Sequence, residues 1–275
     1  MHILFIGYGQ TSQRVAKKLW QQGHRITAIS RTPKPNALVN HLVQDVHHLN
    51  LTQLFPIDCV YILLSPQERT MTAYEQIYLA TVPIIIAALK SHPIQKIILL
   101  SSTRVYGEQQ GQYIDDTTKI QPSDLGGEIL RQMELCYLNA FPKQTIVVRP
   151  SGIYGTSLQR MLNLAKNTQT YPAIHWTNRI HLDDLVQFLV DILVFEQPES
   201  SYLLSSGQHV PLHEIIMWFQ KQLNLPILSL QSQQQTGKRM IPTHLQQMGF
   251  NLQHTNCFED YLALLENKNL SEERS

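Results

Sequence analysis

Residues 1–15 read Met-His-Ile-Leu-Phe-Ile-Gly-Tyr-Gly-Gln-Thr-Ser-Gln-Arg-Val, and this stretch decides the fold. An apolar run over 3–6 breaks into Gly7-x-Gly9-x-x-Ser12, after which apolar residues recur at helical spacing. The pattern predicts a strand, a tight turn and a helix. Gly7 permits the turn, Gly9 lets a pyrophosphate approach the backbone, and the helix N-terminus offers free N–H groups. We therefore expect a dinucleotide to bind here; the alternative is an ordinary β-α turn.

The composition is that of a soluble globular protein, with 43% hydrophobic and 16% charged residues. The net charge is +1 and the basic residues are scattered, so we expect no nucleic-acid partner. The three cysteines, Cys59, Cys136 and Cys257, are far apart and indicate a reducing compartment rather than a disulfide framework. The longest apolar stretch, 82–89, is too short to span a membrane, and the N-terminus shows no signal-peptide pattern. A cytoplasmic protein with no membrane partner is expected.

Strands and helices alternate along the chain. Strands are expected at 3–6, 25–30, 42–44, 58–64, 96–100, 145–148 and 201–204, and helices at 70–90, 125–139, 156–167, 179–195, 211–223 and 257–266. Pro83 should kink or divide the helix over 70–90, and 168–178 and 231–235 are expected to be loops. This order predicts an α/β fold with a doubly wound parallel sheet (Rossmann-like), with ligands at the carboxyl ends of its strands.

The residue after the second strand indicates which dinucleotide binds. An NAD site would place an acid there for the ribose hydroxyls, whereas a 2′-phosphate requires a cation. Arg31 stands at this position, so we expect NADP, with NAD remaining possible. The alternative is a solvated arginine.

Two other strand ends also face the expected cofactor. Asp45 and Val46 follow the third strand, where a carboxylate could meet the adenine, and Ser65 follows the fourth, near a ribose. His47 and His48 come next to Asp45, but adjacent histidines point apart and have no carboxylate partner at ligand spacing. A loop is expected there, and no metal site is predicted.

Four motifs in this order carry a resemblance to a known family. They are Gly7-x-Gly9, Ser-Ser-Thr-Arg-Val-Tyr-Gly at 101–107, Arg-Pro-Ser-Gly-Ile-Tyr-Gly at 149–155 and Ile-His-Leu-Asp-Asp-Leu at 180–185. Over nearly its whole length the chain resembles the extended short-chain dehydrogenases/reductases, and more narrowly the NAD-dependent epimerase/dehydratase family in its short atypical branch.

The resemblance implies a dinucleotide-binding core over 1–155, completed by about 178–206, and a small C-terminal substrate-side region built from 156–177 and 207–275. The cofactor-binding residues that the motifs and strand ends indicate are Gly7, Gly9, Gln10, Thr11, Arg31, Asp45, Val46, Leu64, Ser65, Pro66, Ser101, Pro150, Ser151 and Ile153.

The family's chemistry uses a Ser or Thr after the fifth strand and a Tyr-x-x-x-Lys on the next helix, where the lysine depresses the tyrosine pKa. Ser102 matches the first. Counting back from Glu134, which matches a glutamate usual on that helix, the tyrosine position is Gly126 and the lysine position is Leu130. Neither can transfer a proton.

Dehydration would need two acids after Ser102, and the chain has Thr103 and Arg104 there, so a dehydratase is disfavoured. Ser102 and Tyr106 are the candidate catalytic residues. Tyr154, Glu128 and Arg131 are other candidate substitutes for the missing pair. The alternative is packing for the two tyrosines and a solvated helix face for the charged pair.

Two functions stay open at this stage. The first is an NADP-dependent oxidoreductase or epimerase acting on a small or sugar-like substrate. The second is a catalytically silent NADP(H)-binding sensor or partner-binding module, which the missing Tyr-x-x-x-Lys pair favours. The helices over 70–90 and 125–139 pair between subunits in relatives of this fold, so a homodimer is expected.

Overall fold

The structure is a computed structural model that describes residues 1–34, 38–68 and 70–272, and its chain divides into two compact units. The first unit comprises 1–107, 119–149 and 186–202, and the second comprises 108–118, 150–185 and 203–275. The first unit holds β1 to β5 of the larger sheet and all of β7 except Pro150. Residues 108–118, 150–155, 178–185 and 203–206, which belong to the predicted cofactor-binding core, cluster with the second unit, so the predicted division of the chain stays a prediction.

A seven-stranded parallel sheet in the order β12-β7-β5-β4-β1-β2-β3 confirms the predicted α/β fold class. Its strands are β1 (His2–Ile6), β2 (Arg25–Ser30), β3 (Asn40–Val43), β4 (Cys59–Ile62), β5 (Lys96–Leu100), β7 (Thr145–Pro150) and β12 (Ser201–Leu204). β1 pairs with both β2 and β4, so the strand order reverses direction at β1. A crevice at the carboxyl ends of the strands is expected at such a switch point.

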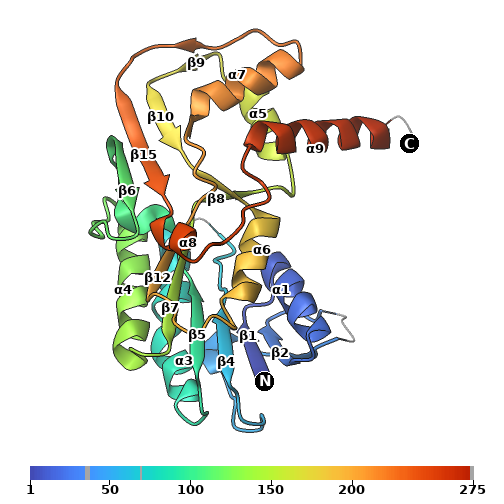
Figure 1. Cartoon of the computed structure of the whole chain (residues 1–275), viewed down its shortest axis with the longest axis vertical. Coiled ribbons are helices and arrows are strands. Elements are labelled where there is room, and N and C mark those ends of the chain that lie inside the picture. The colour runs from blue at the N-terminus through green and yellow to red at the C-terminus, as the bar shows by residue number, and fades with distance from the viewer. Residues whose placement is uncertain (35–37, 69, 273–275) are drawn as a thin grey trace. The chain divides into compact units, whose positions relative to one another are not determined.

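Helices cover both faces of this sheet in the first unit. Figure 1 shows α1 (Gln10–Gln21) on one side and α3 (Val82–Leu89) and α4 (Leu125–Ala140) on the other. α4 also packs against α2 (Met71–Tyr78). The predicted break at Pro83 is confirmed, because α3 begins next to it and the chain turns between α2 and α3.

By length and composition alone, Met71–Leu89 is apolar enough to cross a membrane. It comprises α2, α3 and the turn between them, and Ile85 and Leu89 on α3 are fully buried in the first unit. Since length and composition do not separate a membrane span from a helix of a globular fold, the cytoplasmic location stays a prediction.

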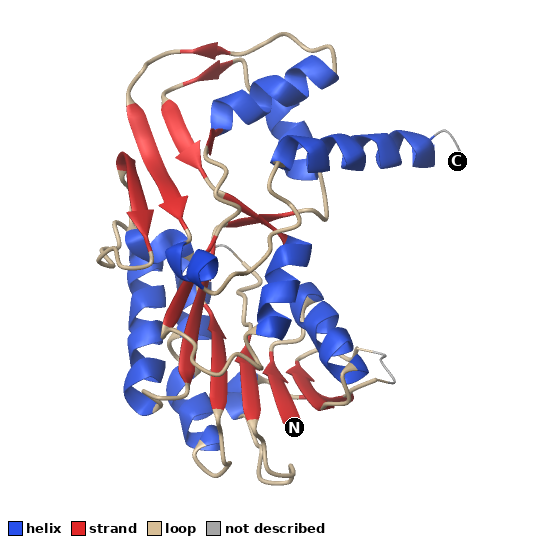
Figure 2. Ribbon diagram, viewed as in Figure 1, coloured by secondary structure: helices blue, strands red, loops and turns tan. Residues whose placement is uncertain are grey.

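The second unit has a smaller sheet of its own, in the order β13-β10-β15-β6 (Figure 2). Its strands are β6 (Gln110–Asp115), β10 (Ile174–Thr177), β13 (Val210–Pro211) and β15 (Gln235–Ile241). The second unit also contains two separate two-stranded sheets. One pairs β8 (Gly152–Tyr154) with β11 (Arg179–His181), and the other pairs β9 (Thr170–Tyr171) with β14 (Ser229–Leu230). The loop predicted over 168–178 is therefore wrong, since it contains β9 and β10.

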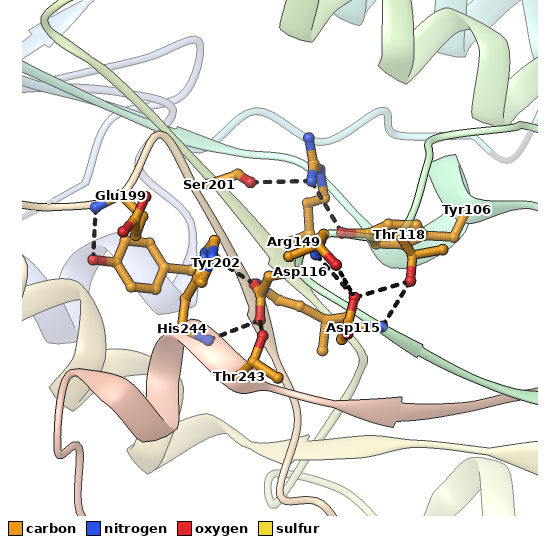
Figure 3. Close-up of polar contacts among 12 residues, drawn as sticks. Tyr106, Asp115, Asp116, Thr118, Arg149, Glu199, Ser201, Tyr202, Thr243 and His244 are labelled. Carbon is orange, nitrogen blue, oxygen red and sulfur yellow. Dashed lines mark hydrogen bonds and ion pairs between the residues drawn. The ribbon is translucent and has the colours of Figure 1, made fainter.

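Helices α5 (Gln159–Asn167), α7 (Leu212–Gln222) and α9 (Cys257–Glu272) pack around an apolar core in the second unit. The unit also contains the start of α6 (Leu182–Asp191), whose last turns belong to the first unit, and α8 (Thr243–Gln247). Phe219 on α7 and Tyr261 on α9 are buried in this core. A buried carboxylate, Asp116, accepts hydrogen bonds from Leu203 N, Thr243 Oγ1 and His244 N, which fixes the start of α8 (Figure 3).

Candidate cofactor groove and catalytic region

The turn between β1 and α1 has the geometry that its glycines predict. Gly7 has φ +93°, and a Cβ there would overlap the Leu63 carbonyl oxygen. Gly9 is the N-cap of α1, and a Cβ there would meet no atom within 4 Å. Ser12 is buried and donates a hydrogen bond of 2.8 Å to the Gly7 carbonyl. The serine therefore ties the helix to the turn.

Two adjoining pockets form a groove in the first unit, sharing four of their lining residues. The inner pocket is lined by Gly7, Tyr8, Gly9, Ile29, Ser30, Arg31, Thr32, Lys34, Gln44, Val46, Leu63, Leu64, Ser65, Gln67 and Ile77. The outer pocket adds His47, Pro66, Glu68, Thr70, Thr72, Ala73 and Gln76. Seven predicted cofactor residues thus line the groove, and Gln10 and Thr11 are the first residues of α1.

Two cations lie along this groove. Arg31, at the end of β2, is exposed, and Lys34 lines the inner pocket beside it. Burial and the charge of Lys34 lower the pKa of His41, whose Nε2 lies 2.8 Å from Ser30 Oγ. Sequence reasoning missed Lys34, although it follows Arg31 by three residues.

Asp45 is engaged with its neighbour in the chain. Its carboxylate accepts hydrogen bonds from His47 N at 3.0 Å and pairs with His47 Nδ1 at 2.8 Å, capping the short 3₁₀ helix Val46–His48. The expectation that His47 has no carboxylate partner is therefore wrong. These hydrogen bonds lower the pKa of Asp45.

The end of β5 carries the two predicted serines. Ser101 is buried, and its hydroxyl has no hydrogen-bond partner among the residues that the structure describes. Ser102 Oγ accepts a hydrogen bond from Arg104 N at 3.2 Å and caps the 3₁₀ helix Thr103–Tyr106. An unpartnered buried hydroxyl costs free energy unless a ligand or water satisfies it.

Tyr106 lies in a buried polar cluster. It is fully buried, and its hydroxyl accepts a hydrogen bond of 3.0 Å from Arg149 (Figure 3). Arg149 also pairs with Glu134 of α4 at 2.8 Å. Burial opposes the charge of Arg149, but the hydrogen bond and charge of Glu134 outweigh it and raise the arginine pKa. This geometry favours packing over proton transfer for Tyr106.

The start of α4 shows what stands at the two altered catalytic positions. Gly126 and Leu130 are both buried, one helical turn apart. The Arg104 guanidinium lies against Gly126 and is held by Asp124, the N-cap of α4. Glu128 and Arg131 pair with each other at 3.2 Å, as expected for a solvated helix face.

The second unit has its own pocket. It is lined by Gly152, Ile153, Tyr154, Thr156, Ser157, Arg160, Met161, Thr177, Asn178, Arg179, Leu212 and Tyr261. Of the predicted cofactor residues, Pro150, Ser151 and Ile153 belong to this unit, and Ile153 lines its pocket. The Ser151 hydroxyl is buried with no partner in the described part of the chain.

Tyr154 belongs to a polar chain in the second unit. Its hydroxyl donates to Asp260 at 2.5 Å, and the other Asp260 oxygen lies 2.7 Å from His254 Nδ1. His181 stacks on His254 with ring centroids 3.6 Å apart and planes 16° apart. Stacked rings direct their nitrogen lone pairs in parallel planes, so the two histidines do not converge on one metal ion, although ligand atoms of His181, His254 and Asp260 lie within 4.8 Å of one another.

The chain matches a known protein family over most of its length. Residues 3–193 match the NAD dependent epimerase/dehydratase family. The chain belongs to this family. This epimerase/dehydratase family member is 24% identical to Protein YeeZ of Escherichia coli K12 over 213 residues, which cover 73% of this chain and 75% of YeeZ.

Solved structures of the same fold extend the similarity to nearly the whole chain. A putative NAD-dependent epimerase/dehydratase from Methylobacillus flagellatus has a TM-score of 0.79 and 25% identity, covering 98% of each chain. UDP-glucuronic acid 4-epimerase from Bacillus cereus, in complex with NAD, has a TM-score of 0.75 and 15% identity, covering 92% of this chain and 93% of the other.

Proposed function

We propose that this protein is an NADP(H)-dependent oxidoreductase or epimerase that acts on a small, sugar-like substrate. The observation that carries the proposal is the groove of the first unit, in which the glycine turn and two cations, Arg31 and Lys34, line one continuous surface. When bound, the nicotinamide ring would accept or donate a hydride.

The groove fits a dinucleotide. The space that a Cβ would fill at Gly9 leaves room for a pyrophosphate, and the α1 N-terminus supplies N–H groups and partial positive charge for it. Val46 would border the adenine, and Ser65 the ribose. Arg31 and Lys34 would hold the 2′-phosphate, each by a charge-assisted hydrogen bond.

A thermal-shift screen with NADP+, NADPH, NAD+ and NADH tests this assignment. Ligand binding to the folded state stabilises it by about 2.7 kcal/mol at a ligand concentration of 100 times Kd. We expect the largest rise in melting temperature with NADP+ and NADPH. No rise with any of the four would reject the cofactor, and larger rises with NAD+ and NADH would reject the choice of NADP.

The residues that line the pocket of the second unit favour binding of an anionic substrate. Arg160 and Arg179 line it together with hydroxyl side chains such as Ser157 and Thr177. Guanidinium and hydroxyl groups bind phosphate or carboxylate oxygens. Two similar structures hold UDP-glucose or UDP-glucuronic acid with NAD. Stabilisation of the wild type by UDP-glucose that Arg160→Ala removes would support a nucleotide-linked sugar; no stabilisation would argue against it.

A second candidate is cofactor binding without turnover. It is favoured by Gly126 and Leu130, which cannot transfer protons, and by Arg104, which lies over Gly126. Absorbance of NADPH at 340 nm with a panel of sugars and nucleotide sugars separates the two functions. A substrate-dependent change in NADPH concentration, or conversion of a sugar to its epimer detected by NMR, favours the enzyme, and cofactor binding with neither favours the sensor.

We also propose a homodimer. In the first unit α2 and α3 pack on α4, which exposes 60% of Leu125 and 43% of Leu135. Burying such side chains between subunits would contribute favourable free energy. Light scattering at micromolar concentration should give twice the chain mass of 31.7 kDa, and a mass near 31.7 kDa would reject the dimer.

A further inference from the structure

The guanidinium of Arg104 fills the space beside Gly126. A Cβ on Gly126 would lie 2.5 Å from Arg104 Cζ and Nη1 and 2.8 Å from Nη2. A tyrosine at position 126 would have to extend through the space that this guanidinium fills. Arg104 therefore occupies the start of the path that the family's tyrosine side chain would take.

Neighbouring groups fix the orientation of this side chain. Arg104 Nε donates to Asp124 Oδ1 at 2.9 Å and Oδ2 at 3.1 Å, and Cζ lies 5.4 Å from the Tyr74 ring centroid. Asp124 is itself held by Gly127 N, which donates to it at 2.7 Å. Arg104 is thus attached to α2 and α4 and is not a freely moving surface arginine.

The far end of Arg104 is available for a ligand. Its side chain is 35% exposed, and none of the residues that the structure describes accepts a hydrogen bond from its two terminal nitrogens. These nitrogens carry four N–H donors. A partly exposed ion pair contributes little to stability, so the pair with Asp124 does not by itself explain an arginine at this position.

The chemistry of the group decides what it can do. A guanidinium stays protonated, so it cannot accept a proton from a substrate hydroxyl as an ionised tyrosine does. Its planar fork instead binds a carboxylate through two parallel hydrogen bonds. Ser102, whose Oγ accepts from Arg104 N, still has its own hydroxyl hydrogen to donate.

We propose that Arg104 is a specificity-determining residue that binds the carboxylate of the ligand, with Ser102 as a second donor. This rests on the proposed function, because the ligand is the small, sugar-like substrate proposed there, although Arg104 and Ser102 do not line the pocket that holds Arg160 and Arg179. The substrate class is then a sugar acid rather than a neutral sugar.

Saturation-transfer NMR detects the weak binding of monosaccharides and tests this on the full chain. The probes are D-glucuronate, D-glucose and D-glucose 6-phosphate, each with and without NADP+. We expect the wild type to bind D-glucuronate roughly 10- to 100-fold more tightly than D-glucose, the range that charge-assisted hydrogen bonds give. Arg104→Ala should abolish this preference and Arg104→Lys should reduce it, because lysine keeps the charge and loses the fork.

Two further variants separate a binding role from a structural one. Arg131→Ala, which removes an arginine of similar exposure from α4, should keep the preference. Gly126→Ala keeps every charge but pushes the guanidinium aside, and it should weaken D-glucuronate binding at least about tenfold. Circular dichroism of each variant should match the wild type.

The outcomes distinguish this proposal from the proposed function. NADPH binding is measured separately by its fluorescence. If NADPH binds but the wild type does not prefer D-glucuronate, or Arg104→Ala leaves the preference intact, the role of Arg104 is overturned and the cofactor assignment stands. Tighter binding of D-glucose 6-phosphate than of D-glucuronate also overturns the proposal that Arg104 binds a carboxylate. If D-glucuronate is preferred and NADPH does not bind, the proposed function fails instead.

Discussion

The β1–α1 turn and the start of α4 have diverged from the family pattern to different degrees. In the turn, Gly7 has a left-handed backbone conformation, and the space where a Cβ of Gly9 would lie is open, as dinucleotide binding requires. The start of α4 keeps its helix but has Gly126 and Leu130 at the positions of the acid–base pair, and a guanidinium covers one of them.

These two segments show which parts of such a site depend on side chains. A pyrophosphate is bound by backbone N–H groups and a helix terminus, so the turn needs only small residues. Proton transfer needs particular side chains, and two substitutions on a helix face remove them. α4 keeps its place because Glu134, farther along the helix, pairs with Arg149 inside the first unit.

The largest expected effect comes from restoring the missing pair. The variant Arg104→Ala, Gly126→Tyr and Leu130→Lys opens the space beside position 126 and adds a proton donor with a cationic neighbour. General acid–base catalysis contributes roughly 10² to 10⁴ in rate, so NADP+-dependent oxidation of a sugar should rise by that order. The backbone permits it, because Gly126 is outside the left-handed region.

The matched control carries phenylalanine in place of the new tyrosine. It should fold equally well and stay inactive. Because Leu130 is buried, the melting temperature of both variants must be measured beside the rate. Robust oxidation by the unmodified protein that survives Ser102→Ala, Tyr106→Phe and Tyr154→Phe would show that the active site lies elsewhere.

The next largest effect concerns the buried ion pair between Glu134 of α4 and Arg149. Glu134→Ala leaves Arg149 charged and buried, and breaking a buried pair on one side costs about 3–5 kcal/mol. Glu128→Ala breaks an exposed pair on the same helix and should cost less than about 1 kcal/mol. Urea denaturation measures both free energies of unfolding, and equal losses would contradict the anchoring role of Glu134.

The two glycines of the turn should respond differently to alanine. Gly7→Ala strains the backbone and meets the Leu63 carbonyl, so the free energy of unfolding should fall by about 1–3 kcal/mol or more. Gly9→Ala meets nothing in the protein and should change stability by less than about 0.5 kcal/mol. NADPH affinity should nevertheless fall at least about tenfold, because its Cβ points into the proposed pyrophosphate site. Unchanged affinity in Gly9→Ala would remove the pyrophosphate from this turn.

The smallest effect is a dependence of the stability of the second unit on pH. Burial and then the charge of His254 lower the pKa of His181 from its ordinary 6.5, although Asp183, Asp260 and Asp184 oppose the shift. The unfolded chain therefore binds this proton more readily. The stability that neutral His181 contributes is present above pH 6.5 and is lost as the pH falls below it.

Tryptophan fluorescence can follow this loss. In a Trp20→Phe background the remaining tryptophans, Trp176 and Trp218, both lie in the second unit. His181→Phe keeps a stacked ring without a titrating group and should flatten the dependence. The exposed His48 serves as the control, and His48→Ala should leave the slope of the free energy of unfolding against pH unchanged. An unchanged slope in His181→Phe would assign the dependence to another group.

Sequence patterns predicted the larger sheet well because strands such as β1, β4 and β5 contain continuous apolar runs. β2 and β5 have the expected bounds, and the break next to Pro83 follows from the missing N–H of proline. The glycine turn was also readable, since φ above zero and close approach each demand a glycine. These features depend on a few neighbouring residues.

The second unit was predicted less well for the converse reason. β6, β10 and β15 pair across more than 60 residues and are half-exposed, so no local apolar run marks them. The place of Arg104 beside Gly126 depends on packing between α4 and the 3₁₀ helix after β5, which spacing does not reveal. Lys34 was missed because it adds a second cation outside the single position that the strand-end rule considers.

We propose that the groove of the first unit binds a dinucleotide and selects its 2′-phosphate, and calorimetric titration with NADPH and NADH tests this most directly. The wild type should bind NADPH roughly 10- to 100-fold more tightly. Arg31→Ala with Lys34→Ala should erase the preference and leave NADH binding nearly unchanged. Arg25→Ala, which alters the opposite end of β2, should keep it. Equal or tighter binding of NADH by the wild type would contradict the claim.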